Sequence, residues 1–248
     1  MYDPVELAEE IIPQISKGDN RRYYRLARGG RWYGGISTAD CVGCNLRCIF
    51  CWSNYPRDHA SRCGRYYAPE EVSSALLSNA KRNHYRQVRI SGNEPTLIQE
   101  HLFAIIELVE KSNLKFLLET NGIIINSDYA KRLANYGNLS VRVSLKGASP
   151  EEFSRLTGAD KEAFSLQIRA LELLHRQGVN CWTSVMLSFS NKNDVANLRE
   201  RIRGISPRMY IEEEYIFLYP HVVERLKKAS LTPTVAYPVN QIPKDLVE

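Results

Sequence analysis

The chain has 248 residues, of which 44% are hydrophobic and 25% charged, and its formal net charge is +5 at pH 7. This length suits one α/β domain with a sizeable core, and no apolar stretch approaches the about 18–20 residues of a membrane span, so we expect no membrane association. The charge excess is modest beside domains that bind nucleic acid by charge alone, and it leaves the class of partner open. Because the amino terminus lacks the basic and apolar regions of a signal peptide, we expect the protein in the cytoplasm.

The predicted elements alternate between strand and helix after an amphipathic amino-terminal helix at residues 1–17, which is broken near Pro13. Six such units predict a parallel sheet, because a parallel neighbour is reached only through a crossover. Residues 230–248 contain three prolines and should be extended or irregular. The strands are expected at 36–40, 86–91, 114–120, 139–145, 179–187 and 209–217, and the helices at 69–83, 97–111, 127–136, from Ser149 onward, 161–177 and 194–203.

Three cysteines follow the first predicted core strand in a CxxxCxxC spacing, Cys44, Cys48 and Cys51. One loop of this kind can ligate three irons of a 4Fe-4S cube, which leaves the fourth iron without a protein ligand. An open position in a metal site is typical of catalytic centres. The loop therefore predicts an enzyme.

Other uses of the cysteines are weaker interpretations. A structural zinc site usually needs a second CxxC pair or a spaced pair of histidines, and neither follows this loop. Disulfides need an oxidising compartment. Cys41, three residues before the loop, is an alternative ligand but is better explained as a small thiol that ends a strand, and Cys63 could face a substrate.

Further motifs extend the pattern. Phe50 precedes the third cysteine, and the later segments are Ser91–Pro95, Glu119–Gly122 and Val143–Lys146. In this order the motifs resemble the radical S-adenosylmethionine (SAM) superfamily, with a GGEP-like and a TNG segment, from about residue 36 to residue 190. The resemblance implies a single-domain partial (β/α)6 radical SAM barrel with parallel strands. Residues 36–228 would form the barrel, 1–35 a helical and basic-aromatic extension, and 229–248 a tail.

The resemblance also implies the site residues. The metal ligands would be Cys44, Cys48 and Cys51, and SAM would occupy the open iron. Asn93 stands where the family most often has a second glycine, which weakens backbone mimicry at one position. No catalytic side chain is expected beyond the cluster and SAM. The SAM contacts would come from Phe50, Gly92, Asn93, Glu94, Pro95, Asn121, Ser144 and Lys146.

All these motifs follow predicted strands, where ligands collect in α/β sheets. The implied reaction is reductive cleavage of SAM by the 4Fe-4S cluster to a 5'-deoxyadenosyl radical, which abstracts hydrogen from a substrate. It requires a low-potential electron donor such as ferredoxin or flavodoxin, and it should be oxygen-sensitive. By contrast, Glu212, Glu213 and Glu214 are expected to be solvated rather than paired for acid-base catalysis, and their position near the barrel mouth leaves a substrate role open.

The sequence does not decide which class of substrate the enzyme acts on. The compact layout resembles the glycyl-radical-enzyme activases, similar to the pyruvate formate-lyase activating enzyme, which act on a glycine of a partner protein. Trp52 after Cys51 also resembles the wybutosine-type tRNA-modifying enzymes. Residues 21–33 interleave cations and aromatics, which suits phosphates and stacked bases, although a solvated arm or aromatics packed beneath the barrel is the simpler interpretation. The alternative outside enzymes is an iron-sulfur redox or sensing module.

Overall fold

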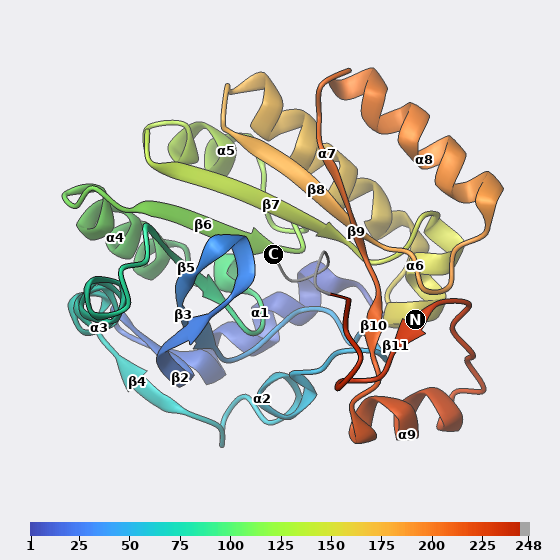
Figure 1. Ribbon diagram of the computed structural model, residues 1–248, viewed down its shortest axis with the longest axis horizontal. Coiled ribbons are helices and arrows are strands. Elements are labelled where there is room, and N and C mark those ends of the chain that lie inside the picture. The colour runs from blue at the N-terminus through green and yellow to red at the C-terminus, as the bar shows by residue number, and fades with distance from the viewer. Residues whose placement is uncertain (244–248) are drawn as a thin grey trace.

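An open arc of six parallel strands forms the centre of the computed structural model, which describes residues 1–243 (Figure 1). The order is β3-β5-β6-β7-β8-β9, and every neighbouring pair in it is parallel. This confirms the predicted α/β class and the parallel (β/α)6 layout. The strands are β3 (Ile36–Cys41), β5 (Gln87–Ser91), β6 (Lys115–Thr120), β7 (Leu139–Leu145), β8 (Cys181–Met186) and β9 (Ile211–Glu214).

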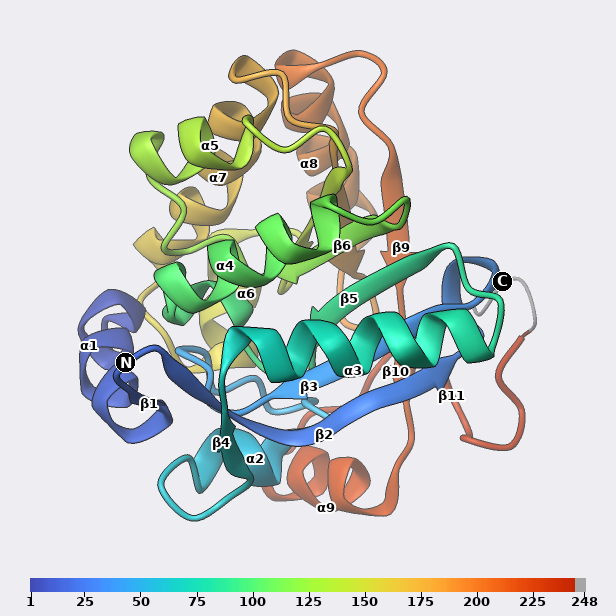
Figure 2. The same cartoon turned by 90° about the vertical axis from the view of Figure 1, so that its left-hand side faces the viewer.

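The crossover helices cover the outer, convex side of this arc (Figures 1 and 2). Alternate strand residues such as Val88, Phe116 and Val141 are fully buried beneath them. Helix starts follow the expected chemistry: the Ser149 side chain accepts a hydrogen bond from the Glu152 amide at 3.4 Å. The helices are α3 (Pro69–Arg82), α4 (Gln99–Glu110), α5 (Ser127–Leu133), α6 (Pro150–Thr157), α7 (Phe164–Arg176, preceded by the 3-10 turn η3, Lys161–Ala163) and α8 (Lys192–Ile205).

The amino-terminal residues extend the sheet instead of forming a solvated arm. Helix α1 (Pro4–Ile15) continues through Pro13, so the predicted break there is wrong. It is followed by β1 (Ser16–Lys17) and the long β2 (Asn20–Gly30), and β2 pairs antiparallel with β1, with β3 and with β4 (Arg65–Tyr67). Tyr23 is 2% exposed, and its hydroxyl lies 3.0 Å from His101 Nε2 on α4. Some of the aromatics in residues 21–33 therefore pack in the protein interior, which agrees with the interpretation that these aromatics are packed and not with that of a solvated arm.

The carboxyl-terminal part differs from the predicted strand at 209–217. The strand is interrupted at Tyr215, so that β9 is followed by a separate β10 (Ile216–Phe217). Helix α9 (Pro220–Lys228) then leads to β11 (Ala236–Tyr237), which pairs parallel with β10. The tail is otherwise irregular as expected up to residue 243, and its last part, 244–248, lies outside the described residues. The division into extension, barrel and tail stays a prediction.

Within residues 1–243, no helix has both the length and the apolar character that crossing a membrane requires.

Candidate functional site

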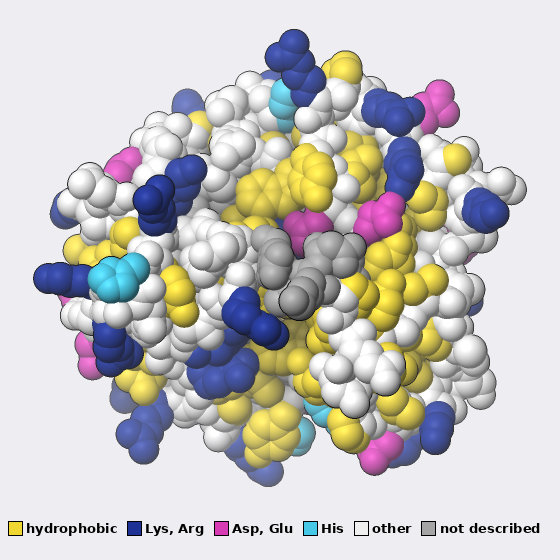
Figure 3. Space-filling view, in the orientation of Figure 1, with side chains coloured by type: hydrophobic (Ala, Val, Ile, Leu, Met, Phe, Trp, Pro, Cys, Tyr) yellow, Lys and Arg dark blue, Asp and Glu magenta, His cyan; other side chains and the backbone are white. Residues whose placement is uncertain are grey.

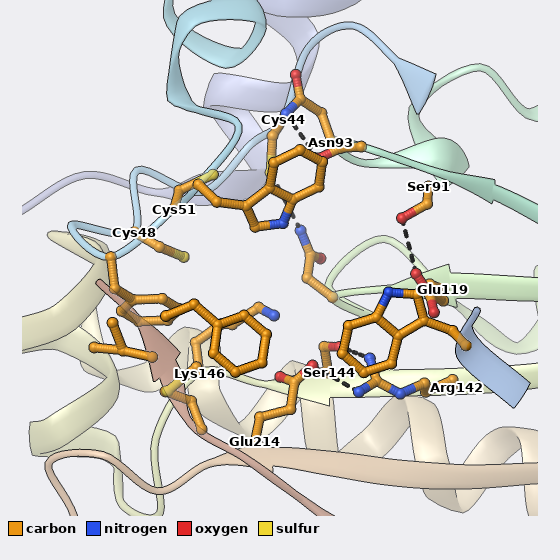
Figure 4. A pocket seen from close by; sticks show the side chains of 18 of the residues that line it. Cys44, Cys48, Cys51, Ser91, Asn93, Glu119, Arg142, Ser144, Lys146 and Glu214 are labelled. Atoms are coloured by element: carbon orange, nitrogen blue, oxygen red, sulfur yellow. Dashed lines mark hydrogen bonds and ion pairs between the residues drawn. The ribbon is translucent and has the colours of Figure 1, made fainter. Parts of the chain in front are cut away.

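A cavity of about 610 Å³ lies inside the arc and reaches the carboxyl ends of the strands (Figure 4). Of the eleven residues predicted for the cluster and SAM, ten line it: Cys44, Cys48, Phe50, Cys51, Gly92, Asn93, Glu94, Asn121, Ser144 and Lys146. Pro95 is buried and begins a 3-10 turn, η2 (Pro95–Leu97), away from the cavity lining. Cys41 is fully buried at the end of β3, and neither Cys41 nor Cys63 lines the cavity.

The three thiols lie together at one end of this cavity, on the loop between β3 and the short helix α2 (Asn54–Asp58) (Figure 4). Among residues 1–243, no three His, Cys, Asp or Glu side chains are grouped so that they could hold a single metal ion. Burial raises the pKa of the Cys44 thiol well above its ordinary value. Burial also raises the pKa of Cys48 to about 11, although the charge of Lys146 opposes this rise. Ligation of a metal centre would therefore release protons from these groups.

Arginines from three places hold the backbone of the cysteine loop. The carbonyls of Cys44, Cys48 and Cys51 each accept a hydrogen bond from one guanidinium. Their respective donors are Arg47 in the loop, Arg57 on α2, at 2.6 Å, and Arg225 on α9. These hydrogen bonds hold the three carbonyls in place and thereby fix the shape of the loop.

The charge of these arginines is only partly neutralised. Asp58 pairs with Arg57 at 2.7 Å and lies 3.9 Å from Arg47. Arg225 donates from Nε to the Ile49 carbonyl at 2.9 Å, and its Nη1 is buried without a partner within the described residues. Three cations beside one carboxylate leave a net positive charge around the cysteine loop.

Asn93 braces the same loop from β5. Its Oδ1 accepts from the Gly43 amide at 3.0 Å, just before the first cysteine, and its Nδ2 donates to the Ser53 carbonyl at 3.1 Å, just after the third. A second glycine in this position could make neither bond. The preceding Gly92 has φ +98°, and a Cβ there would lie 2.9 Å from that of Asp40, so glycine is required at this position.

Glu94 is 2% exposed, and its carboxylate is fully used within the chain. Oε1 accepts from the Thr96 amide at 3.2 Å and from the hydroxyls of Thr96 at 2.7 Å and Thr120 at 2.6 Å. Oε2 accepts from the Asn121 amide at 2.7 Å. An ionised carboxylate offers about four acceptor sites, so these four donors tie the end of β5 to the end of β6.

The remaining predicted residues lie around the same cavity. Asn121 Nδ2 donates to Asn45 Oδ1 at 2.8 Å and is 3.9 Å from the Cys44 sulfur. The Ser144 hydroxyl accepts from Arg142 at 3.0 Å and lies 3.0 Å from that of Ser184. Lys146, at the end of β7, extends into the cavity between Cys48 and Glu214 (Figure 4).

Ion pairs that sequence reasoning missed cover the inner face of the sheet. Arg142 donates to Glu212 at 2.8 and 2.7 Å and to Glu214 at 2.6 Å. Glu212 and Glu214 are therefore paired with Arg142, and the prediction that they are solvated is wrong. These pairs reach from β7 across β8 to β9, and only the period-two alternation of polar residues in β7 could have indicated a polar inner face.

Glu119 on β6 forms a second ion pair of this kind. It accepts from Arg89 at 2.7 Å and from Ser91 at 2.8 Å. Burial alone would raise the pKa of Glu119, but the charges of Arg89 and Arg142 outweigh it and lower the pKa to about 2. The carboxylate is therefore ionised at neutral pH, and the cavity contains fixed charges of both signs.

An open parallel sheet with charged side chains along its inner face and thiols at its carboxyl edge defines an α/β protein with an internal ligand site. Residues 40–202 match the model of the Radical SAM superfamily. This is more than half of the chain, so the protein belongs to the radical SAM superfamily. Members of this superfamily are enzymes that use a 4Fe-4S cluster and SAM.

Individual relatives agree with this assignment. The chain is 33% identical over 115 residues to a probable GTP 3',8-cyclase of Methanocaldococcus jannaschii, covering 46% of this chain and 37% of that protein. It is 29% identical over 139 residues to the mycofactocin maturase MftC of Mycobacterium ulcerans, covering 54% and 34%. The fold resembles Streptococcus suis SuiB bound to S-adenosylmethionine, with a TM-score of 0.59, 16% identity, and coverage of 76% and 44%. The chain thus spans under half the length of these proteins.

Proposed function

We propose that the protein binds a 4Fe-4S cluster through Cys44, Cys48 and Cys51 and binds SAM at the open iron. The observation that carries this proposal is the presence of all three thiols at one end of an internal cavity, opposite charged side chains that could hold a substrate. A cube distributes its thiolates over separate irons, so the ligands need not converge on one point. The unneutralised arginines around the loop favour an anionic centre there.

The polar side chains nearby suit the two charges of the methionine part of SAM. The ammonium of Lys146 extends into the cavity and would pair with the SAM carboxylate. Ser144 would face the ribose, and Phe50 would cover the adenine or the cluster. Gly92 and Asn93 would contact the SAM ammonium through backbone groups, whereas Glu94, with four internal donors, would position Thr120 and Asn121 instead of touching SAM.

When bound, the cluster and SAM supply one-electron reductive cleavage of a carbon–sulfur bond, which starts hydrogen abstraction from a substrate. The chain's own residues bind SAM and exclude water from it. An external low-potential reductant, such as ferredoxin or flavodoxin, would supply the electron.

The test is anaerobic reconstitution with iron and sulfide, followed by dithionite and SAM. We expect 5'-deoxyadenosine from the wild-type protein, and its loss together with most of the bound iron in Cys48→Ser. Cys63→Ser is the matched control, because Cys63 lies off the cavity, and it should keep both properties. A cluster that Cys48→Ser leaves intact, or a wild-type cluster that never responds to SAM, would instead favour the redox-module interpretation.

The substrate is a finer question. An activase-like reaction on a protein glycine stays a prediction, because the relatives reported above are named as a probable GTP 3',8-cyclase and a mycofactocin maturase. The first of these names favours a nucleotide. A stable organic radical on a partner protein after it is mixed with the enzyme would support the activase reaction. A mass change in tRNA after incubation with the enzyme would support the RNA-modifying alternative.

A further inference from the structure

A row of cations along β2 forms one wall of the cavity, and nothing in the proposed cluster and SAM site uses it. Arg25, Arg28 and Arg31 all line the cavity. The pairing of β2 with β3 places Arg25 opposite Asp40 near the carboxyl edge and Arg28 opposite Thr38, further down. Gly30, the last residue of β2, lies opposite Ile36 at the start of β3, so the three cations are spaced along the wall from the carboxyl edge of β3 toward its amino end.

This wall carries more positive than negative charge. Arg28 binds both oxygens of Asp40, at 2.6 and 3.1 Å, and Arg25 adds an ion pair to the same carboxylate at 2.8 Å. Arg31 has no ion-pair partner within residues 1–243. Two of the three guanidinium groups therefore share one carboxylate, and the third has none among the described residues. Figure 3 shows dark-blue side chains on one side of the centre of this face and magenta side chains on the other.

The turn that carries Arg31 is fixed in place. The next residues form a 3-10 turn, η1 (Trp32–Gly34), in which Tyr33 has φ +56°. The Tyr33 hydroxyl donates to Glu119 at 3.3 Å, and its carbonyl accepts from the Gln87 side chain. Trp32 stacks on Phe217 of β10, with ring centroids 6.4 Å apart and planes at 23°. The cationic wall is thus built into the fold, across the open side of the arc.

Flat aromatic surfaces accompany the cations. Trp52 is 43% exposed, lines the cavity directly after Cys51, and has the Arg25 guanidinium 5.4 Å above its ring. Its carbonyl is held at 3.0 Å by His221 Nε2 on α9. An exposed indole beside an arginine can stack a planar ring while the cation binds an attached anion.

We propose that Arg25, Arg28 and Arg31, with Trp52, form a subsite for a free nucleotide, with phosphates on the arginines and the base on the indole. This inference rests on the proposed function, because it names the substrate class of that same site. Arginine binds phosphate with paired hydrogen bonds, which suits three guanidinium groups on one wall. Arg25, Arg28 and Arg31 line the same internal cavity as the three cysteines, and a wall inside the arc suits a free nucleotide better than an RNA strand.

The test uses the reconstituted protein with SAM and measures equilibrium binding of the four ribonucleoside triphosphates and of their nucleosides. We expect at least one nucleotide to bind roughly tenfold or more tightly than its nucleoside. Arg31→Gln should weaken the nucleotide roughly tenfold and leave the nucleoside unchanged, because only the phosphates touch this residue. Trp52→Leu should weaken nucleotide and nucleoside by the same factor.

Arg176→Gln is the control, because Arg176 is an exposed arginine of α7 that does not line the cavity, and it should change neither binding constant. The subsite is wrong if no nucleotide binds at millimolar concentration, if Arg176→Gln weakens binding as much as Arg31→Gln, or if tRNA binds while free nucleotides do not. SAM cleavage is measured in the same preparation. Absent nucleotide binding with intact cleavage overturns the subsite alone, whereas absent cleavage overturns the proposed function.

Discussion

At the scale of single residues, the cysteine loop depends on side chains whose roles the sequence motif did not indicate. The departure from a second glycine at Asn93 gives the loop a brace, since this amide bonds to backbone on both sides of the three cysteines. Glu94 also has a structural role, because its carboxylate ties the end of β5 to the end of β6 through hydrogen bonds. The motif thus locates the site, while tertiary contacts determine what each member does.

Asn93→Gly tests the brace. Loss of its bonds to Gly43 and Ser53 should lower the free energy of unfolding by about 1–2 kcal/mol and should speed the loss of iron to a chelator. The comparison variant is Asn113→Gly, in an exposed turn, which should leave iron retention unchanged. Iron retention in Asn93→Gly equal to that of the wild-type protein would show that the brace is dispensable.

At the scale of elements, the core strands and crossover helices could be predicted because each has its own local hydrophobic pattern. Strand β2 was missed, since Arg and Gly residues dominate it and its pairing with β3 supplies its stability. Helix α9 was missed as well. Its contact with the cysteine loop joins residues more than 170 positions apart, which no local pattern can reveal.

Arg225→Ala tests whether α9 supports the loop. Without this guanidinium the carbonyls of Ile49 and Cys51 lose their donor, and we expect iron to be lost to a chelator several-fold faster than from the wild-type protein. Lys228→Ala, in the exposed last turn of the same helix, is the matched control. Equal rates for the two variants would mean that α9 does not act through Arg225.

His101 links α4 to β2 and should make stability depend on pH. Burial lowers the pKa of His101 from 6.5 to about 4, against a smaller opposing effect of its hydrogen bond to the Asp19 carbonyl. Because the folded pKa is depressed, its contribution is complete above pH 6.5 and is lost as pH falls toward 4, by about 3 kcal/mol in total. Urea unfolding between pH 7 and 4 should show this loss.

His101→Gln should flatten that pH dependence, whereas His175→Gln, at the exposed end of α7, should not. An unchanged slope in His101→Gln would show that other groups cause the loss of stability.

At the scale of the whole molecule, the sheet is open on one side, between β2 and β9. The cavity extends from the three cysteine thiols to the ion-paired side chains on the inner face of the sheet. The predicted arc and cysteine loop are sufficient to locate this cavity. The ion pairs on its walls could not be predicted, because they depend on the order in which the strands lie side by side in the sheet. The proposed cluster ligands, the proposed SAM contacts and the cationic wall all line this one cavity.

The most direct test of the account is hyperfine spectroscopy of the reduced, reconstituted protein with SAM that is isotope-labelled at its amino and carboxylate groups. If three cysteines leave one iron open, the labelled nuclei should couple to the cluster spin. A centre with four protein ligands and no coupling to labelled SAM would contradict it.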